Sequence, residues 1–132
     1  MESKFLPIPQ EVEEVCNDVI ECAFRVHRKL GPGLLESVYE TCLCYELTLL
    51  NRSYQRQLPI PIIYGDVRID NGFRLDLLVE NCVIVDLKAC EKLIPLYEAQ
   101  LLTYMKLCVM RLGLIINFNV PLLKDGIKRF VL

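Results

Sequence analysis

The chain has 132 residues, of which 53% are hydrophobic and 24% charged, and this composition excludes an intrinsically disordered protein. Its length suits a single domain over residues 1–132. Fifteen basic against seventeen acidic residues give a net charge of −2, which excludes a protein that coats nucleic acid by charge alone.

The sequence shows no sign of export or membrane insertion. Met1-Glu2-Ser3-Lys4 carries an acid early, and no apolar stretch typical of a signal peptide follows it. The longest uncharged run, residues 112–123, is shorter than the ~20 apolar residues of a membrane span. The seven cysteines form no CxxC motif, and the single histidine, His27, argues against a zinc site. We expect a soluble, cytoplasmic protein with reduced cysteines.

Two helices are predicted before the first strand. Apolar residues at spacings of three and four from Gln10 to Leu30 indicate an amphipathic helix, which Gly31-Pro32-Gly33 ends. The next helix, from about Leu34 to Leu50, is apolar on most sides, so we expect it to be largely buried. His27 lies beside the inner stripe of the first helix, where we expect a satisfied polar contact.

Strands follow, with one more helix among them. Pro59 and Pro61 confine the extended segment 54–64 to an edge or irregular strand, and Asp70-Asn71-Gly72 predicts a turn. The other expected elements are strands over 73–79 and 83–89 around a turn at 80–82, a helix over about 95–112 that Gly113 stops, strands over 114–118 and 127–131, and a loop over 121–126. The order α-α-β-β-β-α-β-β predicts an α+β or mixed α/β fold in which helices cover a sheet.

Charged residues interrupt the apolar strands over 73–79 and 83–89. Asp86 and Lys88 share one face, because side chains alternate along a strand. Asp76 joins them only if the connecting loop has three residues, so that Val79 pairs with Val83 and the two Asp Cβ atoms lie ~5 Å apart. A two-residue loop would turn Asp76 to the opposite face.

Two carboxylates this close, in strands this apolar, would drive one of them toward its neutral form. A bound Mg²⁺ would remove the conflict, and Lys88 beside the pair would stabilise developing charge. A structural ion-pair cluster of Asp86, Lys88 and Asp76 explains the same residues equally well.

Three further polar residues interrupt apolar helix faces. Glu36 aligns with Leu43 and Leu47 on the expected buried stripe, where an acid needs a partner unless it caps the helix. Gln100 and Tyr104 lie four residues apart on one face of the third helix, which an ordinary helix surface would also explain. All three are candidates for a cleft shared with the two aspartates and the lysine.

These residues carry a family resemblance. Asp76 followed by Asp86-Leu87-Lys88 resembles the D…(D/E)xK signature of the PD-(D/E)xK nuclease superfamily, and Glu36 with Gln100 and Tyr104 resembles its RecB-like branch. The segment Leu30-Gly31-Pro32-Gly33-Leu34-Leu35-Glu36-Ser37-Val38-Tyr39 resembles the signature of the GxxExxY protein family, and segments 113–118 and 123–129 resemble its C-terminal blocks. Asp86 stands where that family more often has Glu.

The resemblance implies a restriction-endonuclease-like core, in which a central mixed sheet is flanked by helices. It also implies that Glu36, Asp76 and Asp86 bind Mg²⁺ (or Mn²⁺), joined by the carbonyl of Leu87. Lys88 would orient the attacking water or steady the developing charge. Gln100 and Tyr104 would support the site or the substrate backbone.

Two functions are therefore expected. The first is a Mg²⁺-dependent nuclease, a phosphodiester hydrolase acting on nucleic acid. The alternative is a non-catalytic, vestigial nuclease that binds a protein or nucleic-acid partner, which the net charge and small size favour. The many apolar residues of the third helix predict a homodimer. Basic groups around Arg28 and around Lys124 are most simply solvated faces, and they would rim a cleft if the nuclease hypothesis holds.

Overall fold

The computed structural model describes residues 6–132. Residues 1–5, and with them the segment Met1-Glu2-Ser3-Lys4 on which the prediction about export rests, lie outside the described residues. No helix within residues 6–132 combines the length and apolar content that crossing a membrane requires. The elements are α1 (Gln10–Leu30), α2 (Glu36–Leu49), β1 (Tyr54–Tyr64), β2 (Val67–Val79), β3 (Val83–Lys88), α3 (Pro95–Cys108), β4 (Leu112–Asn117), the 3₁₀ turn η2 (Leu123–Asp125) and β5 (Ile127–Val131).

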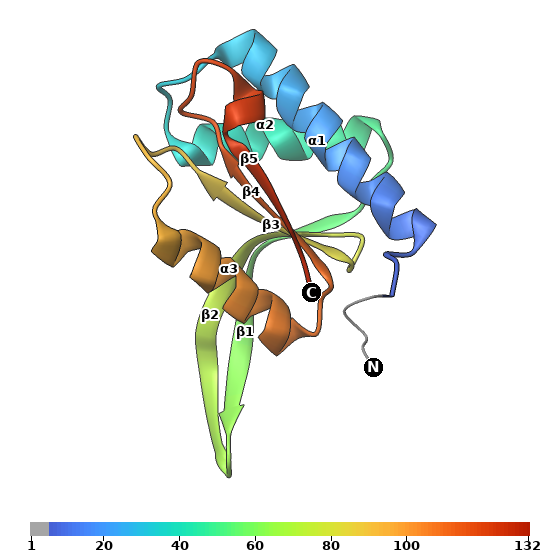
Figure 1. Ribbon diagram of the computed structural model, residues 1–132, viewed down its shortest axis with the longest axis vertical. Coiled ribbons are helices and arrows are strands. Elements are labelled where there is room, and N and C mark those ends of the chain that lie inside the picture. Colours follow the sequence, from blue (N-terminus) through green and yellow to red (C-terminus); the bar gives the residue numbers. More distant parts are fainter. Residues whose placement is uncertain (1–5) are drawn as a thin grey trace.

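The five strands form one mixed sheet in the order β1-β2-β3-β4-β5. Strands β3 and β4 are parallel and are joined through α3, whereas the other three neighbouring pairs are antiparallel. This arrangement confirms the predicted α+β class and the predicted order of elements. Figure 1 shows α1 and α2 on one side of the sheet and α3 on the other, with the β1–β2 hairpin projecting beyond both.

The two helical layers divide the core according to the alternation of side chains along β3. Val83, Val85 and Leu87 pack in the cluster under α1 and α2, whereas Ile84 packs with Leu101 of α3. Asp86 and Lys88 have the same parity as Ile84 and therefore belong to the face that α3 covers. This is the division expected from the sequence.

The predicted turn at Asp70-Asn71-Gly72 is wrong. Ile60 pairs with Phe73 and Ile62 with Ile69. The three residues Asp70, Asn71 and Gly72 therefore lie opposite a single residue of β1 and form a bulge inside β2. Asn71 adopts a left-handed φ of 56°, which explains why an Asn-Gly pair occurs within a strand. The chain reverses instead at Gly65-Asp66, where Gly65 has a φ of 59°.

The third helix ends at Cys108, earlier than predicted, and Gly113 does not stop it. Val109 takes the left-handed conformation that closes the helix, with φ 57° and ψ 46°. Gly113 lies in β4, where a Cβ atom would stand 2.7 Å from Sδ of Met105. The glycine therefore permits close contact between α3 and β4.

The second helix is less buried than its composition predicted. Tyr39, Leu43 and Leu47 are buried, but Tyr45 and Leu49 are exposed. Leu101 and Met105 of α3 are buried within the chain, and exposed apolar side chains are left at Leu96, Leu102 and Leu107 of α3 and at Val109 just after it. His27 makes its expected contact, since its Nε2 lies 2.8 Å from the carbonyl oxygen of Val120.

Candidate functional site

The register of β2 and β3 brings two aspartates together. Val79 pairs with Val83 and Leu77 with Val85, which is the register of a three-residue loop. One step further along the same register sets Asp76 opposite Asp86. Oδ2 of Asp76 accepts a hydrogen bond of 2.8 Å from the backbone N–H of Leu87, which fixes this carboxylate against β3.

Asp86 is a buried acid whose pKa lies well above its usual value. It is 8% exposed, and its Oδ2 is buried without a hydrogen-bond partner among the described residues. Burial raises the pKa of Asp86 to about 7; Lys88 opposes this rise, and the charge of Asp76, a hydrogen bond with Asp76 and the charge of Glu36 add to it. A carboxylate held in this way needs a counter-charge that the protein supplies only in part.

Lys88 supplies that partial counter-charge. Its Nζ lies 3.6 Å from Oδ1 of Asp86. This ion pair is one of the contacts that a purely structural cluster of Asp86, Lys88 and Asp76 requires. The same ammonium group lies 4.3 Å from the ring centroid of Tyr97, the third residue of α3, and is held there by a cation–π interaction. Tyr97 was missed by sequence reasoning, because its partner at the end of β3 is visible only once the chain has folded.

Glu36 does not lie on the buried stripe of α2, as its spacing suggested. It is the first residue of α2 and is exposed, whereas the buried acid of that stripe is Glu40, which binds Arg56 at 3.0 Å and Gln57 at 2.7 Å. Partial burial and the negative charge of Asp76 raise the pKa of Glu36, while Lys88 lowers it. Glu36 therefore interacts electrostatically with the Asp76–Asp86 pair from the start of α2.

The loop before Glu36 is fixed by Tyr39. The Tyr39 hydroxyl donates a 2.6 Å hydrogen bond to the carbonyl of Gly31 and accepts one of 3.1 Å from the N–H of Leu34. Its ring stacks on Phe118 with centroids 4.5 Å apart, and the N–H of Phe118 donates to the carbonyl of Lys88. These contacts tie the loop before α2 to the end of β3 through Tyr39.

Of the two predicted residues on α3, Tyr104 lies nearer the acids. Its ring stacks on Phe73 of β2 with centroids 4.4 Å apart. Burial raises the pKa of Tyr104, and the neighbouring charge of Asp86 adds to the rise. Gln100 lies one turn earlier on α3 and is exposed, so it is available to a ligand but is not built into the cluster.

Asn117 is a second residue that sequence reasoning passed over. It pairs with Lys88 across β3 and β4 and is 2% exposed. Its side chain accepts a hydrogen bond from the N–H of Cys90 and donates one to the carbonyl of Cys90, so it holds the chain as it leaves β3. The sequence signal that could have pointed to Asn117 is its amide side chain within the otherwise apolar run 112–118.

The residues present fit a divalent cation at the aspartate pair. The partnerless Oδ2 of Asp86 and the adjacent carboxylate of Asp76 are the oxygen donors that Mg²⁺ and Mn²⁺ prefer, and such ions keep several waters. Within residues 6–132, no three His, Cys, Asp or Glu side chains lie close enough to enclose a metal ion by themselves. Water and substrate oxygens would therefore complete the coordination.

Comparison with known proteins supports one assignment. The family model described as PD-(D/E)XK nuclease superfamily matches residues 13–130, a range that includes all six predicted site residues. No curated protein and no solved structure matches the chain. Since the model spans nearly the whole chain and the structure has the mixed sheet expected of that core, the chain belongs to the PD-(D/E)XK nuclease superfamily.

Proposed function

We propose that the chain is a nuclease that hydrolyses phosphodiester bonds of nucleic acid with the help of a divalent cation, Mg²⁺ or Mn²⁺. The observation that carries the proposal is the buried Oδ2 atom of Asp86, which accepts no hydrogen bond within residues 6–132 and lies in a carboxylate that interacts with Asp76. A purely structural ion pair with an ionised Asp86 would leave this oxygen unsatisfied, at a cost that proteins rarely accept.

Asp76, Asp86 and the carbonyl of Leu87 would hold the ion, and Glu36 would contribute its charge from the start of α2. When bound, a divalent cation lowers the pKa of water and offsets negative charge on phosphate. Without a cation, burial raises the pKa of Asp86 to about 7, and a bound divalent cation would favour the ionised carboxylate.

Lys88 would orient the attacking water or a phosphate oxygen. Its ammonium group has only Asp86 and the Tyr97 ring as close partners among the described residues, so donors are free for a substrate. Tyr104, stacked on Phe73, and the exposed Gln100 would support the substrate backbone beside it.

Calorimetric titration with Mg²⁺ and Mn²⁺ tests the metal site. We expect the wild-type protein to bind and Asp76→Ala/Asp86→Ala to lose binding. The control Asp66→Ala/Asp70→Ala removes two exposed carboxylates of the β1–β2 hairpin and should bind as the wild type does. Loss of binding in the control as well would mean that the metal responds to net charge alone.

A cleavage assay tests the reaction. Asp86→Ala should abolish hydrolysis of nucleic acid and Lys88→Ala should slow it by about 10²–10³-fold, both without altering the circular dichroism spectrum. Full activity in both variants would exclude this assignment.

The non-catalytic alternative is favoured by one observation. Because no three potential ligands within residues 6–132 gather tightly, the acids could be a vestige of a lost metal site. This function predicts binding of a protein or nucleic-acid partner that is unaffected by chelators and by Asp76→Ala/Asp86→Ala.

We further propose the finer assignments to the GxxExxY family and the RecB-like branch, which the Tyr39 contacts and the position of Tyr104 support.

We also propose that the protein forms a homodimer, which the exposed side chains of Leu102, Leu107 and Val109 support. A monomer in sedimentation at micromolar concentration would refute it.

A further inference from the structure

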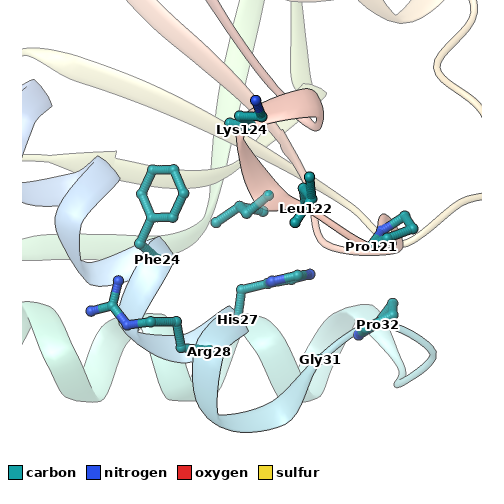
Figure 2. A pocket seen from close by; sticks show the side chains of 9 residues that line it. Phe24, His27, Arg28, Gly31, Pro32, Pro121, Leu122 and Lys124 are labelled. Atoms are coloured by element: carbon teal, nitrogen blue, oxygen red, sulfur yellow. The ribbon is translucent and has the colours of Figure 1, made fainter.

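A pocket of about 520 Å³ lies at the end of α1. Figure 2 shows that the last turns of α1 and the following residues Gly31 and Pro32 form one side, and that the loop before β5 forms the other. The pocket is lined by none of the six residues proposed for hydrolysis. It therefore requires its own explanation.

The charge of this pocket is positive. Arg28 from α1 and Lys124 from η2 line it, and its lining includes no aspartate or glutamate. Arg28 has one distant acidic neighbour, Glu21, at 4.0 Å, and its side chain is 63% exposed. Both cations are therefore available to an anion such as a phosphate group.

The remaining walls are apolar and suit a flat ring. Phe24, Pro32, Pro121, Leu122 and Leu123 line the cavity, and Figure 2 shows Phe24 on α1 and Leu122 on the loop before β5. Phe24 is anchored on the core, whereas Leu122 is 58% exposed and loses water on contact with a ligand. An apolar slot with a cationic edge is the combination that binds a base together with its phosphate.

The pocket is preformed. Nε2 of His27 lies 2.8 Å from the carbonyl oxygen of Val120, so the ring joins α1 directly to the loop that forms the opposite wall. On the α1 side, the Tyr39 hydroxyl also fixes the carbonyl of Gly31. A pocket held at both walls binds its ligand with little loss of conformational freedom.

Three contacts connect the pocket to the proposed reaction centre. The carbonyl of Lys88 accepts a hydrogen bond from Phe118, Phe118 stacks on Tyr39, and Tyr39 binds the carbonyl of Gly31 in the pocket wall. The pocket wall is thus joined to the end of β3 that carries Lys88, with the acids on the face that α3 covers and the pocket on the α1 side.

From this arrangement we propose that the pocket binds one unpaired nucleotide of the nucleic-acid substrate. Arg28 and Lys124 bind its phosphate, and the base lies in the apolar part of the pocket, in contact with Phe24 and Leu122. The inference rests on the proposed nuclease function and narrows its substrate to nucleic acid with an unpaired strand.

Fluorescence anisotropy with a labelled single-stranded oligonucleotide tests the pocket in the presence of EDTA, so that cleavage does not interfere. We expect Arg28→Gln/Lys124→Gln to weaken binding at least about tenfold and to lower the slope of log affinity against log salt by about 0.7, since the two cations contact one phosphate and each phosphate contact on a single strand contributes about 0.7. The control Arg68→Gln/Lys106→Gln removes the same charge, and Arg68 has the same 63% side-chain exposure as Arg28. Equal weakening in both double variants would overturn the proposal.

A second pair of variants tests the contact with the base. Leu122→Ala should weaken binding of the oligonucleotide but not of an abasic strand of the same length. Leu49→Ala, on α2, is the matched control, because Leu49 is 56% exposed and Leu122 is 58% exposed. If Leu122→Ala affects both strands equally, or if a blunt duplex binds as well as the single strand, no unpaired base occupies the pocket.

This experiment separates the two proposals. Asp76→Ala/Asp86→Ala should still bind the oligonucleotide through the pocket while cleaving nothing. If the wild type cleaves nucleic acid but Arg28→Gln/Lys124→Gln binds the oligonucleotide as tightly as the wild type does, the pocket proposal is refuted and the nuclease function is not. Pocket-dependent binding without cleavage under any metal would refute the nuclease function instead.

Discussion

Nζ of Lys88 lies 3.6 Å from Oδ1 of Asp86, yet Oδ2 of the same carboxylate is buried with no partner within residues 6–132. The lysine therefore satisfies one half of the group. Burial outweighs its charge, and the pKa of Asp86 rises from 3.8 to about 7. This imbalance has measurable consequences for stability and activity.

Asp86→Asn should stabilise the metal-free protein at neutral pH. The raised pKa in the folded state means that folding takes up a proton between about pH 4 and pH 7, so the free energy of unfolding of the wild type falls as pH rises through this range. The asparagine variant lacks this dependence and should be more stable by up to a few kcal/mol near pH 8, and no more stable near pH 4.

Urea unfolding at several pH values, in the presence of EDTA, measures this difference. The control Asp66→Asn changes an exposed acid of the β1–β2 hairpin and should parallel the wild type at every pH. A constant difference between wild type and Asp86→Asn from about pH 4 to pH 8 would contradict the prediction.

Lys88→Ala should lower kcat by about 10²–10³-fold, the usual effect of removing one donor that stabilises charge in the transition state. Its loss also removes the charge that opposes the rise in the pKa of Asp86, so that pKa should move higher still. Initial rates of cleavage as a function of pH measure both effects. Lys92→Ala, an exposed lysine after β3, is the control and should keep wild-type rates.

The aspartate register could be predicted from the sequence, but only as one of two alternatives. Alternation along β3 assigned Asp86 and Lys88 to one face, and the loop length then decided where Asp76 lies. The Asn-Gly pair at 71–72 led to the wrong prediction of a turn, because the same left-handed conformation occurs in a bulge as well as in a turn. Local sequence does not distinguish the two, since the partner strand determines the outcome.

The partners of the site residues could not be predicted, because they come from other elements. Tyr97 beneath Lys88 and Asn117 beside it are set by the packing of α3 and β4 against β3. Helical spacing placed Glu36 on a buried stripe, but the helix begins at this residue, so no preceding turn covers it. Burial at the end of an element depends on its neighbours more than on its own periodicity.

Thiol reactivity should divide the cysteines into two groups. All seven are free thiols; Cys16, Cys22 and Cys44 are buried, and the other four are partly exposed. Burial raises the pKa of Cys22 and Cys44 to about 11, so few thiolates form there near pH 8. A thiol reagent should modify at most four cysteines of the native protein and all seven in denaturant. Mass spectrometry identifies the modified residues, and rapid modification of Cys22 in the native state would contradict the packing of α1.

Tyr39→Phe should destabilise the protein by about 1–3 kcal/mol, because it leaves the carbonyl of Gly31 and the N–H of Leu34 without their partner while retaining the ring. The stacking on Phe118 is unchanged, so the effect should be local. Amide exchange at Leu34 should accelerate more than exchange in β3. Tyr45→Phe on the same helix removes a hydroxyl from a side chain that is 62% exposed and should leave both the free energy of unfolding and the exchange rates unchanged. If Tyr39→Phe behaves like this control, the hydroxyl does not hold the loop, and the Glu36 position must be fixed by the backbone alone.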